Sequence, residues 1–174
     1  MKKLFLLTAL VILTVVNLPL VQVLSISNRK NFSEKIYSFS AVKQGFTISY
    51  THSVNKGRVH DFYRVLSDGN LELFMTEFVS YGAGIPESYE TEDSVFRVTE
   101  NGYVIENLHR HLPRLVMAVG VVAEHSVAVS NKESPLETDF DKEFFLKTFF
   151  KPQTSLLFEV RRVSVLSYVF TKKI

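Results

Sequence analysis

His52 and Ser53 are the first residues whose types could support chemistry, because a histidine can act as a base towards a serine hydroxyl. They follow an alternating apolar and polar segment, and neighbours on a strand point to opposite faces of its sheet. The pair is therefore not a ready nucleophile and base, and Asp61 or Asp68 could complete a triad only through tertiary structure. The Gly-x-Ser-x-Gly pattern of many hydrolases is absent. We favour a strand-end histidine that hydrogen bonds to loop backbone, and we predict no enzymatic activity.

Two further histidines, His109 and His111, stand two residues apart and would share one face of an extended segment. Histidine is a common zinc ligand, but a metal site needs several ligands that converge on one point. His60 or His125 could supply a third ligand only through tertiary contacts that the sequence does not indicate. We therefore predict neither a metal site nor a cofactor.

Gly82, Gly84 and Pro86 indicate a shaped loop, because two glycines and a proline in close succession cannot continue a strand ladder. The backbone N–H groups of such a loop could hold an anion. The Gly-Lys-Ser/Thr ending of phosphate loops is missing, and no helix pattern follows. A tight turn is the favoured interpretation.

The segments that position these candidate residues have the sequence pattern of β-strands. Residues 46–51 alternate between apolar and polar side chains, which is typical of a half-buried strand. Residues 59–66 and 71–79 are rich in β-forming residues and flank Asp68-Gly69. Because Asp-Gly favours the positive φ of a hairpin turn, we predict a hairpin here.

A second hairpin is predicted around Asn101-Gly102, which lies between two further β-rich segments. If these two residues form the loop, Val98 faces Ile105 and Arg97 faces Glu106 on the neighbouring strand. The register would then place one apolar pair on one face of the hairpin.

The remaining chain adds strands and little helix. The valine-rich residues 115–129 predict two short strands, residues 140–150 predict one short helix, and a last strand begins near residue 154. About eight strands with short turns predict a mainly β fold, an antiparallel β-sandwich or a small barrel, with one short helix.

The composition of the chain excludes some classes of function. The chain has 174 residues, of which 46% are hydrophobic and 15 are Phe, enough for one domain with a sizeable core. The formal net charge is +2 and falls to zero without Lys2 and Lys3. Nucleic-acid binding needs a positive surface, so we exclude that class. The sequence has no cysteine, which removes disulfides and thiolate chemistry.

The N-terminus has the pattern of a membrane-targeting segment. Lys2 and Lys3 precede an uncharged, mostly apolar run from residue 4 to residue 24. Such a run predicts a hydrophobic helix that is either a cleaved signal peptide or an uncleaved anchor. The available small-x-small cleavage sites are residues 23–25 and 25–27. In both cases the rest of the chain would face out of the cytoplasm, either anchored to the cell membrane or released.

The predicted organisation follows from these patterns. Residues 1–24 form the signal peptide or signal anchor, the polar residues 25–35 form a linker, and residues 36–174 form a single β domain.

Three motifs in order resemble a known family of small exported bacterial proteins, domain of unknown function family 1850. They are Phe-Thr-Ile-Ser-Tyr-Thr-His-Ser-Val at residues 46–54, Val-His-Asp-Phe-Tyr-Arg-Val at 59–65, and Phe-Val-Ser-Tyr-Gly-Ala-Gly-Ile-Pro at 78–86. The resemblance extends over residues 42–130. The motif positions that match are His52, Ser53, Asp61, Gly82, Gly84 and Pro86. Asp61 stands where the family more often has a glutamate.

The resemblance implies a role beside a transporter. Members of the family are commonly associated with TRAP transporters of the TAXI class, which import solutes with the help of an extracytoplasmic binding protein. The expected function is an exported, membrane-associated accessory or binding protein. Its partners would be the transporter's membrane subunit or its solute-binding protein. The alternatives are a β-sandwich that binds envelope carbohydrate and a hydrolase that uses Ser53 or His52.

Overall fold

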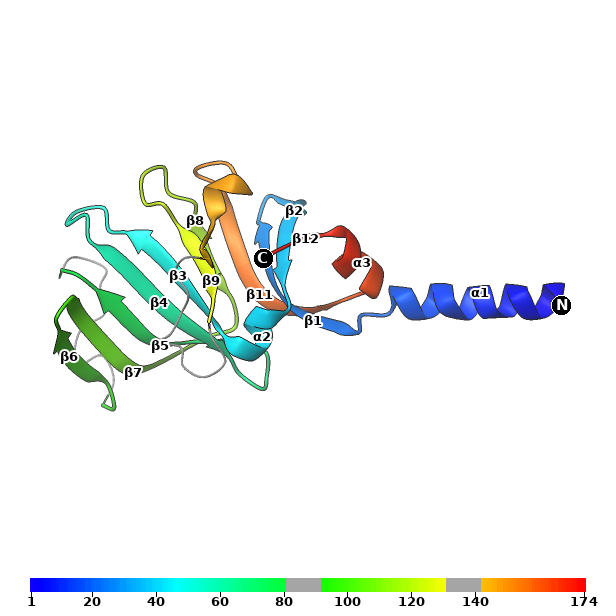
Figure 1. Cartoon of the computed structure of the whole chain (residues 1–174), viewed down its shortest axis with the longest axis horizontal. Coiled ribbons are helices and arrows are strands. Elements are labelled where there is room, and N and C mark those ends of the chain that lie inside the picture. The colour runs from blue at the N-terminus through cyan, green and yellow to red at the C-terminus, as the bar shows by residue number, and fades with distance from the viewer. Residues whose placement is uncertain (81–91, 131–141) are drawn as a thin grey trace.

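The protein consists of two β-sheets around a shared hydrophobic core, and an apolar helix projects beyond them (Figure 1). This computed structural model describes residues 1–80, 92–130 and 142–174. The predicted loop of Gly82, Gly84 and Pro86 lies outside these residues. The predicted mainly β fold is confirmed, and the strands form one sheet of five and one of seven.

The five-stranded sheet has the order β12-β2-β1-β11-β8, so the first strand of the chain pairs with one of the last. All its pairs are antiparallel except that of β12 with β2. Its strands are β1 (Val21–Asn28), β2 (Asn31–Ser38), β8 (Leu115–Ala118), β11 (Ser155–Val163) and β12 (Lys172–Lys173).

The seven-stranded sheet has the order β10-β9-β3-β4-β5-β7-β6 and is antiparallel throughout. Its strands are β3 (Phe46–Thr51), β4 (Arg58–Val65), β5 (Leu71–Phe78), β6 (Val95–Thr99), β7 (Gly102–Leu112), β9 (Ser126–Val129) and β10 (Phe144–Phe145).

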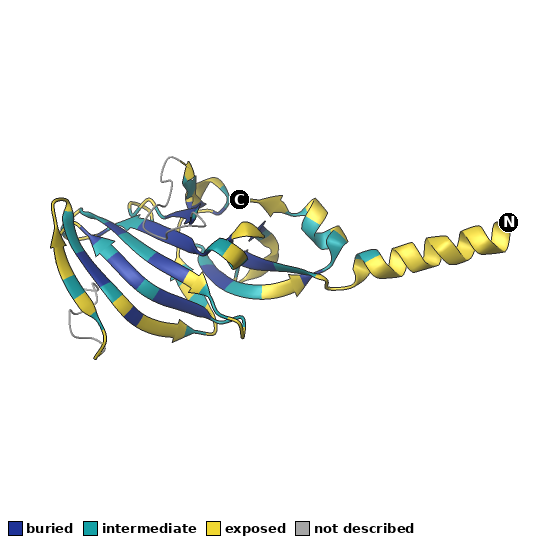
Figure 2. Cartoon of the chain, turned by 60° about the horizontal axis from the view of Figure 1, so that its bottom comes forward, coloured by how far each residue is buried: buried dark blue, intermediate teal, exposed yellow. Residues whose placement is uncertain are grey.

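The helices lie at the ends and margins of the sheets. They are α1 (Lys2–Asn17), α2 (Ser40–Gln44), the 3-10 turn η3 (Leu146–Thr148) and α3 (Val165–Phe170). Helix α1 is rich in apolar residues, yet none of its residues is buried, as Figure 2 shows. Within the described residues, we find no helix that is both long enough and apolar enough to cross a membrane.

The core is built from the inward faces of both sheets. Leu24 and Phe158 of the five-stranded sheet are fully buried in the same cluster as Phe46 and Tyr63 of the seven-stranded sheet. The ring of Phe46 stacks on Tyr63 with centroids 5.2 Å apart and on Phe158 with centroids 6.4 Å apart. This apolar contact removes aromatic surface from water and holds the sheets together.

Both predicted hairpins are present, but the second has a different register. Val98 pairs with Tyr103 rather than Ile105, so the prediction is wrong by two residues. Gly102 belongs to β7 with φ at 147°, and a Cβ there would lie 2.4 Å from the backbone oxygen of Phe78. The close approach of β5 therefore requires glycine inside the strand and moves the turn back along the chain.

The prediction of a linker at residues 25–35 is wrong. Residues 25–28 lie in β1, which has neighbours on both sides, and β2 begins at Asn31. The side chains of Ser25 and Ser27 are buried. Serine is small, and a strand's backbone is paired within the ladder, so these polar residues fit an interior strand whose sequence looks solvent-exposed.

The structure also moves the boundary of the predicted leader, residues 1–24. Helix α1 ends at Asn17, and residues 21–24 already belong to β1. Val23 and Leu24 are fully buried. The β domain therefore begins at Val21 rather than at residue 36.

The helix predicted for residues 140–150 is replaced, in the described part from residue 142, by β10 and the single turn η3. The phenylalanine spacing resembled that of a helix, but Phe144 and Phe145 pair with β9. Edge pairing with a neighbouring strand therefore outweighs local propensity here.

Candidate functional site

A cavity of about 220 Å³ opens between the two sheets, beside the middle of β3 and β4. We call it the inter-sheet cavity. The described residues that line it combine apolar walls with a carboxyl group, two phenols and an imidazole: Ile48, Tyr50, Asp61, Tyr63, Leu115, Met117 and His125. A concave apolar site with a few converging polar groups is typical of a small-ligand site.

Strand register explains why Asp61 points into this cavity. Asp61 pairs with Ile48 on β3 and with Thr76 on β5. Ile48 belongs to the buried core, so the whole row faces the interior. Tyr50 and Tyr63 lie two positions along their strands from Ile48 and Asp61, on the same face, since side chains alternate with period two.

The loss of water around the Asp61 carboxyl group is only partly compensated by hydrogen bonds within the protein. The hydroxyl of Thr76 donates a hydrogen bond to Asp61 Oδ1 at 2.7 Å. Removal from water disfavours the charged carboxylate and raises the pKa of Asp61 to about 6, although Thr76 and the charge of Arg110 act in the opposite direction. The carboxyl group therefore titrates close to neutral pH and has capacity for a further hydrogen-bond donor.

The two tyrosines remain neutral beside Asp61. Burial, followed by the negative charge of Asp61, raises the pKa of both Tyr50 and Tyr63 above the ordinary value. Phenols with raised pKa values stay protonated over the whole physiological range, so each can donate or accept one hydrogen bond within the site.

His125, in the turn before β9, lines the inter-sheet cavity together with Asp61 and the two tyrosines. The backbone N–H of Gly120 donates to His125 Nδ1 at 3.0 Å, which leaves the proton of the neutral ring on Nε2. Burial, with a smaller effect from the charge of Arg58, lowers the pKa of His125. Its ring stacks on Tyr50 with centroids 5.6 Å apart. The cavity thus contains a neutral imidazole N–H donor as well as acceptors.

The residues predicted from the motifs do not form one site. His52 and Ser53 line a different cavity, of about 270 Å³, at the end of β3, while Asp61 lies in the inter-sheet cavity. His52 Nδ1 accepts the backbone N–H groups of Val54 at 3.3 Å and Asn55 at 3.4 Å. The ring of His52 thus holds the turn between β3 and β4. Among the described residues, no group of His, Asp or Glu is arranged to hold a metal ion.

The comparison with protein families concerns the segment that builds this cavity. The family model described as "Domain of unknown function (DUF1850)" matches residues 46–136. The chain belongs to this family. Every residue named above as lining the inter-sheet cavity lies within the matched segment. No curated protein and no solved structure matches the chain.

Within the DUF1850 segment, replacing His52 with alanine is expected to lower the free energy of unfolding by about 1–2 kcal/mol, because two turn N–H groups lose their acceptor. Urea denaturation followed by circular dichroism would measure this loss. His52→Asn is expected to recover part of the stability, since its amide oxygen can replace Nδ1. Ser53→Ala, at an exposed neighbouring position, is the matched control; an equal loss there would show that the ring contacts are unimportant.

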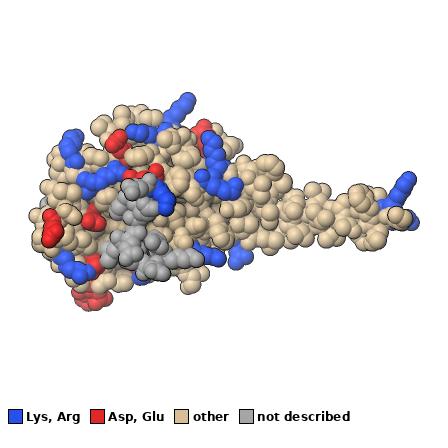
Figure 3. Space-filling view, in the orientation of Figure 1, with Lys and Arg blue, Asp and Glu red and all other residues tan. Residues whose placement is uncertain are grey.

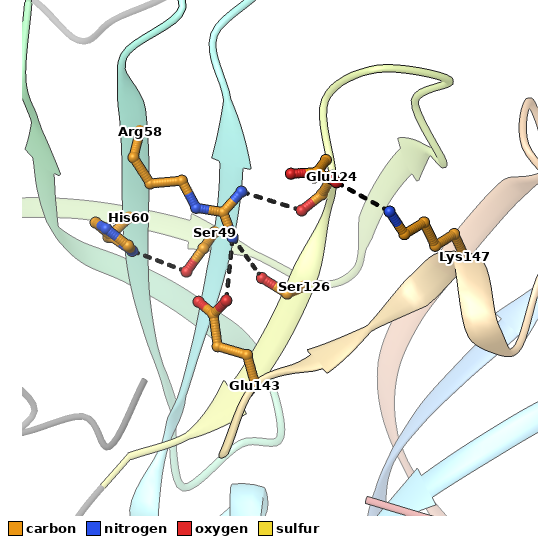
Figure 4. Close-up of polar contacts among 7 residues, drawn as sticks. All are labelled: Ser49, Arg58, His60, Glu124, Ser126, Glu143 and Lys147. Atoms are coloured by element: carbon orange, nitrogen blue, oxygen red, sulfur yellow. Dashed lines mark hydrogen bonds and ion pairs between the residues drawn. The ribbon is translucent and has the colours of Figure 1, made fainter. Parts of the chain in front are cut away.

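A polar network on the opposite face of the same DUF1850 sheet holds the turn that carries His125 (Figure 4). The guanidinium of Arg58 donates to the backbone oxygen of Glu124 at 3.0 Å and to Ser126 Oγ at 2.8 Å. It also forms an ion pair with Glu143 at 3.2 Å. Arg58 therefore binds the residues on both sides of His125 and fixes the position of its ring.

Two further contacts extend this network. Lys147 donates to Glu124 at 2.9 Å, and Ser49 Oγ lies 2.8 Å from His60 Nδ1 (Figure 4). Arg58 and Glu143 were not predicted from the sequence. No local pattern could have indicated them, because the network joins three segments that are distant in the chain.

Proposed function

We propose that this protein binds a small ligand in the inter-sheet cavity and serves, outside the cytoplasm and at a membrane, as an accessory protein of a TAXI-type TRAP transporter. The position of Asp61 supports the binding role most directly. A carboxyl group in a mostly apolar cavity, with a pKa raised to about 6, is costly to keep unless a ligand uses it.

The polar groups of the cavity define the chemistry of its ligand. The Asp61 carboxylate accepts hydrogen bonds, so the ligand should present an N–H or O–H donor towards it. The Nε2–H of His125 and the phenols of Tyr50 and Tyr63 can contact an acceptor on the same molecule. With a volume of about 220 Å³, the cavity suits a ligand smaller than a typical drug molecule.

The cavity supports binding better than catalysis. The described residues that line it do not include a serine, threonine or lysine that could act as a nucleophile. Ser53 and His52 line the other cavity, and their ring and hydroxyl are separated from Asp61. The hydrogen bonds that His52 accepts from the turn explain why a histidine stands at this position, without a catalytic role.

The proposed partner and location rest on the sequence. The resemblance of residues 42–130 to proteins associated with TAXI-type transporters supports an accessory role in solute uptake. The positive start and apolar run at the N-terminus support export and membrane association. Helix α1, with no buried residue, is available for contact with lipid or with another protein.

Thermal unfolding of the purified full chain with a panel of amines, amino acids, carboxylic acids and sugars would test the cavity. At least one compound that carries N–H or O–H donors is expected to raise the Tm of the wild type. Asp61→Asn and Met117→Trp are expected to abolish this rise, since the first removes the acceptor's charge and the second fills the cavity.

Val116→Trp is the matched control for the cavity-filling variant. Val116 neighbours Met117 on β8 but is exposed and does not line the cavity. It should retain the ligand response. A response that survives in Met117→Trp as in Val116→Trp would place the binding site elsewhere.

The partner is tested separately, by crosslinking the tagged full-length protein in native membranes and purifying it. Recovery of a transporter membrane subunit or its solute-binding protein is expected. Recovery of envelope polymer without either protein would contradict the accessory role and leave the cavity experiment unaffected.

A further inference from the structure

Helix α3 presents large apolar side chains to solvent directly beside α1. Leu166, Val169 and Phe170 are exposed, and Phe170 is 82% exposed. Helix α3 contacts α1, and Figure 1 shows it next to the point where α1 leaves the domain. The end of the domain that adjoins α1 is therefore apolar, which is unusual for a protein surface in water.

This apolar surface continues along the chain from α1. Leu18 and Leu20, which connect α1 to β1, are both exposed. None of the residues of α1 is buried either. Exposed apolar side chains thus continue from α1 through the connecting residues to α3.

Basic side chains border the same surface. Residues 159–174 hold four Lys or Arg and one Glu. Lys172 and Lys173 form β12, one residue after the end of α3, and Arg161 and Arg162 lie near the end of β11 that precedes α3. Figure 3 shows Lys and Arg side chains, with few acidic ones, on the part of the domain next to α1.

Aromatic rings lie beneath two of the lysines. The ammonium group of Lys173 lies 5.0 Å from the ring centroid of Tyr168, and that of Lys43 lies 5.1 Å from that of Phe39. The rings of Phe39 and Tyr168 meet edge to face, with centroids 6.4 Å apart. Aromatic and lysine side chains are both typical of the boundary between the acyl chains and the headgroups of a bilayer.

We propose that this end of the domain is a membrane-contacting collar that rests in the interfacial region of an anionic phospholipid bilayer. The collar consists of α3 with Leu18, Leu20, Phe39 and the two lysines that follow α3. Its apolar side chains enter the acyl boundary, while Lys172 and Lys173 contact lipid phosphates. This inference rests on the proposed membrane location, and it adds a contact that holds the β domain in a fixed orientation beside α1.

The chemistry of the collar favours lipid over a protein partner. Its apolar residues are continuous with α1, and its border is basic on both flanking segments, as an anionic lipid surface requires. Helix α3 has six residues, and three of them, Leu166, Val169 and Phe170, are exposed apolar side chains. Exposed apolar side chains on a short helix can enter a fluid boundary without a shaped counterpart.

The absence of cysteine from the chain permits a direct test. Full-length Phe170→Cys and Val169→Cys proteins would be labelled with an environment-sensitive fluorophore and reconstituted into phosphatidylcholine vesicles with and without phosphatidylglycerol. The label at either position is expected to shift to the blue, to be quenched several-fold more by spin-labelled lipid than by iodide, and to respond more strongly with phosphatidylglycerol.

Val98→Cys provides the matched control, because Val98 is 71% exposed on β6, at the end of the seven-stranded sheet far from α1 (Figure 1). Its label should be quenched by iodide and not by the lipid quencher. The double variant Lys172→Glu, Lys173→Glu should lose the effect of phosphatidylglycerol at position 170.

Two results would overturn the collar. The label at position 170 could be as open to iodide as the label at 98 while the protein still floats with the vesicles, which would leave the proposed membrane location intact. Alternatively, it could be protected in native membranes but insensitive to spin-labelled lipid, which would identify a protein as the occupant. Failure to float with vesicles would instead contradict the membrane location itself.

Discussion

Replacing Asp61 with asparagine is expected to raise the free energy of unfolding at pH 8 by about 2–3 kcal/mol. Folding raises the pKa of Asp61 from 3.8 to about 6, so the folded protein binds this proton more tightly than the unfolded chain. The stability that Asp61 contributes is therefore fully present below pH 3.8 and is lost as pH rises through 6. Asparagine keeps an oxygen that can accept from Thr76 and carries no charge at any pH.

Urea denaturation of both proteins between pH 4 and pH 8 would measure this effect. The wild type should lose stability across the interval relative to Asp61→Asn, with the two curves converging at the acidic end. Glu100→Gln, at an exposed position in the turn before β7, controls for the general loss of one negative charge. A variant that is less stable than the wild type at pH 8 would mean that the carboxylate has a strong partner in the folded protein.

A loss of stability caused by the charge of Asp61 in the inter-sheet cavity is consistent with the proposed binding role. A protein whose site is optimised for its own stability would place a neutral residue at position 61. The expected gain in Asp61→Asn would thus accompany loss of the ligand response, and the two measurements together would separate a binding residue from a structural one.

Replacing Arg64 with methionine is expected to lower the free energy of unfolding by about 2 kcal/mol at neutral pH. Arg64 forms an ion pair with Glu72, whose side chain is 1% exposed. The hydrogen bond from Arg64, with a smaller contribution from His109, lowers the pKa of Glu72 to about 2 against the opposing effect of burial. Without Arg64, a buried carboxylate would lose its main partner, although His109 Nδ1 at 2.7 Å would remain.

The pH dependence of this effect has the opposite sign to that of Asp61. Because folding lowers the pKa of Glu72, its contribution is present above pH 4.5 and is lost as pH falls towards 2. The difference between wild type and Arg64→Met should therefore shrink in acid. Arg64 is half exposed, so added salt should also weaken the pair.

A matched ion pair in the same sheet provides the control. Arg97 pairs with Glu106, whose side chain is 22% exposed and remains in contact with water. Arg97→Met is expected to cost less than about 1 kcal/mol. Equal losses in the two variants would show that burial of Glu72 does not determine the strength of its pair.

The hairpins could be predicted from the sequence, whereas the sheet order could not. Asp-Gly and Asn-Gly act locally, and both turns formed near the expected residues. The pairing of β1 with β11 joins residues that are more than a hundred positions apart, and no local pattern indicates it. For the same reason the serines of β1 suggested a linker, although β1 is paired on both sides and the two serines are buried.

The candidate site was predicted only in part. Asp61 was singled out through the resemblance, but its companions Tyr50, Tyr63 and His125 were not grouped with it. Tyr50 and Tyr63 share its face because of the pairing of β3 with β4. His125 reaches the cavity because the backbone of Gly120 and the network of Arg58 hold its turn. The convergence of these side chains on one cavity depends on tertiary structure, so their spacing in the sequence did not predict it.

Because β1 lies inside the five-stranded sheet, the effect of cleaving the N-terminal segment depends on whether cleavage comes before or after folding. Residues 21–28 pair with β11 along their whole length, and both candidate cleavage sites, residues 23–25 and 25–27, lie within this paired strand. After the sheet has closed, a peptidase would find these bonds paired on both sides and inaccessible. A cut made earlier would leave β2 and β11 without the strand that joins them. Proteolytic maturation at either site would therefore remove most of β1 from the five-stranded sheet.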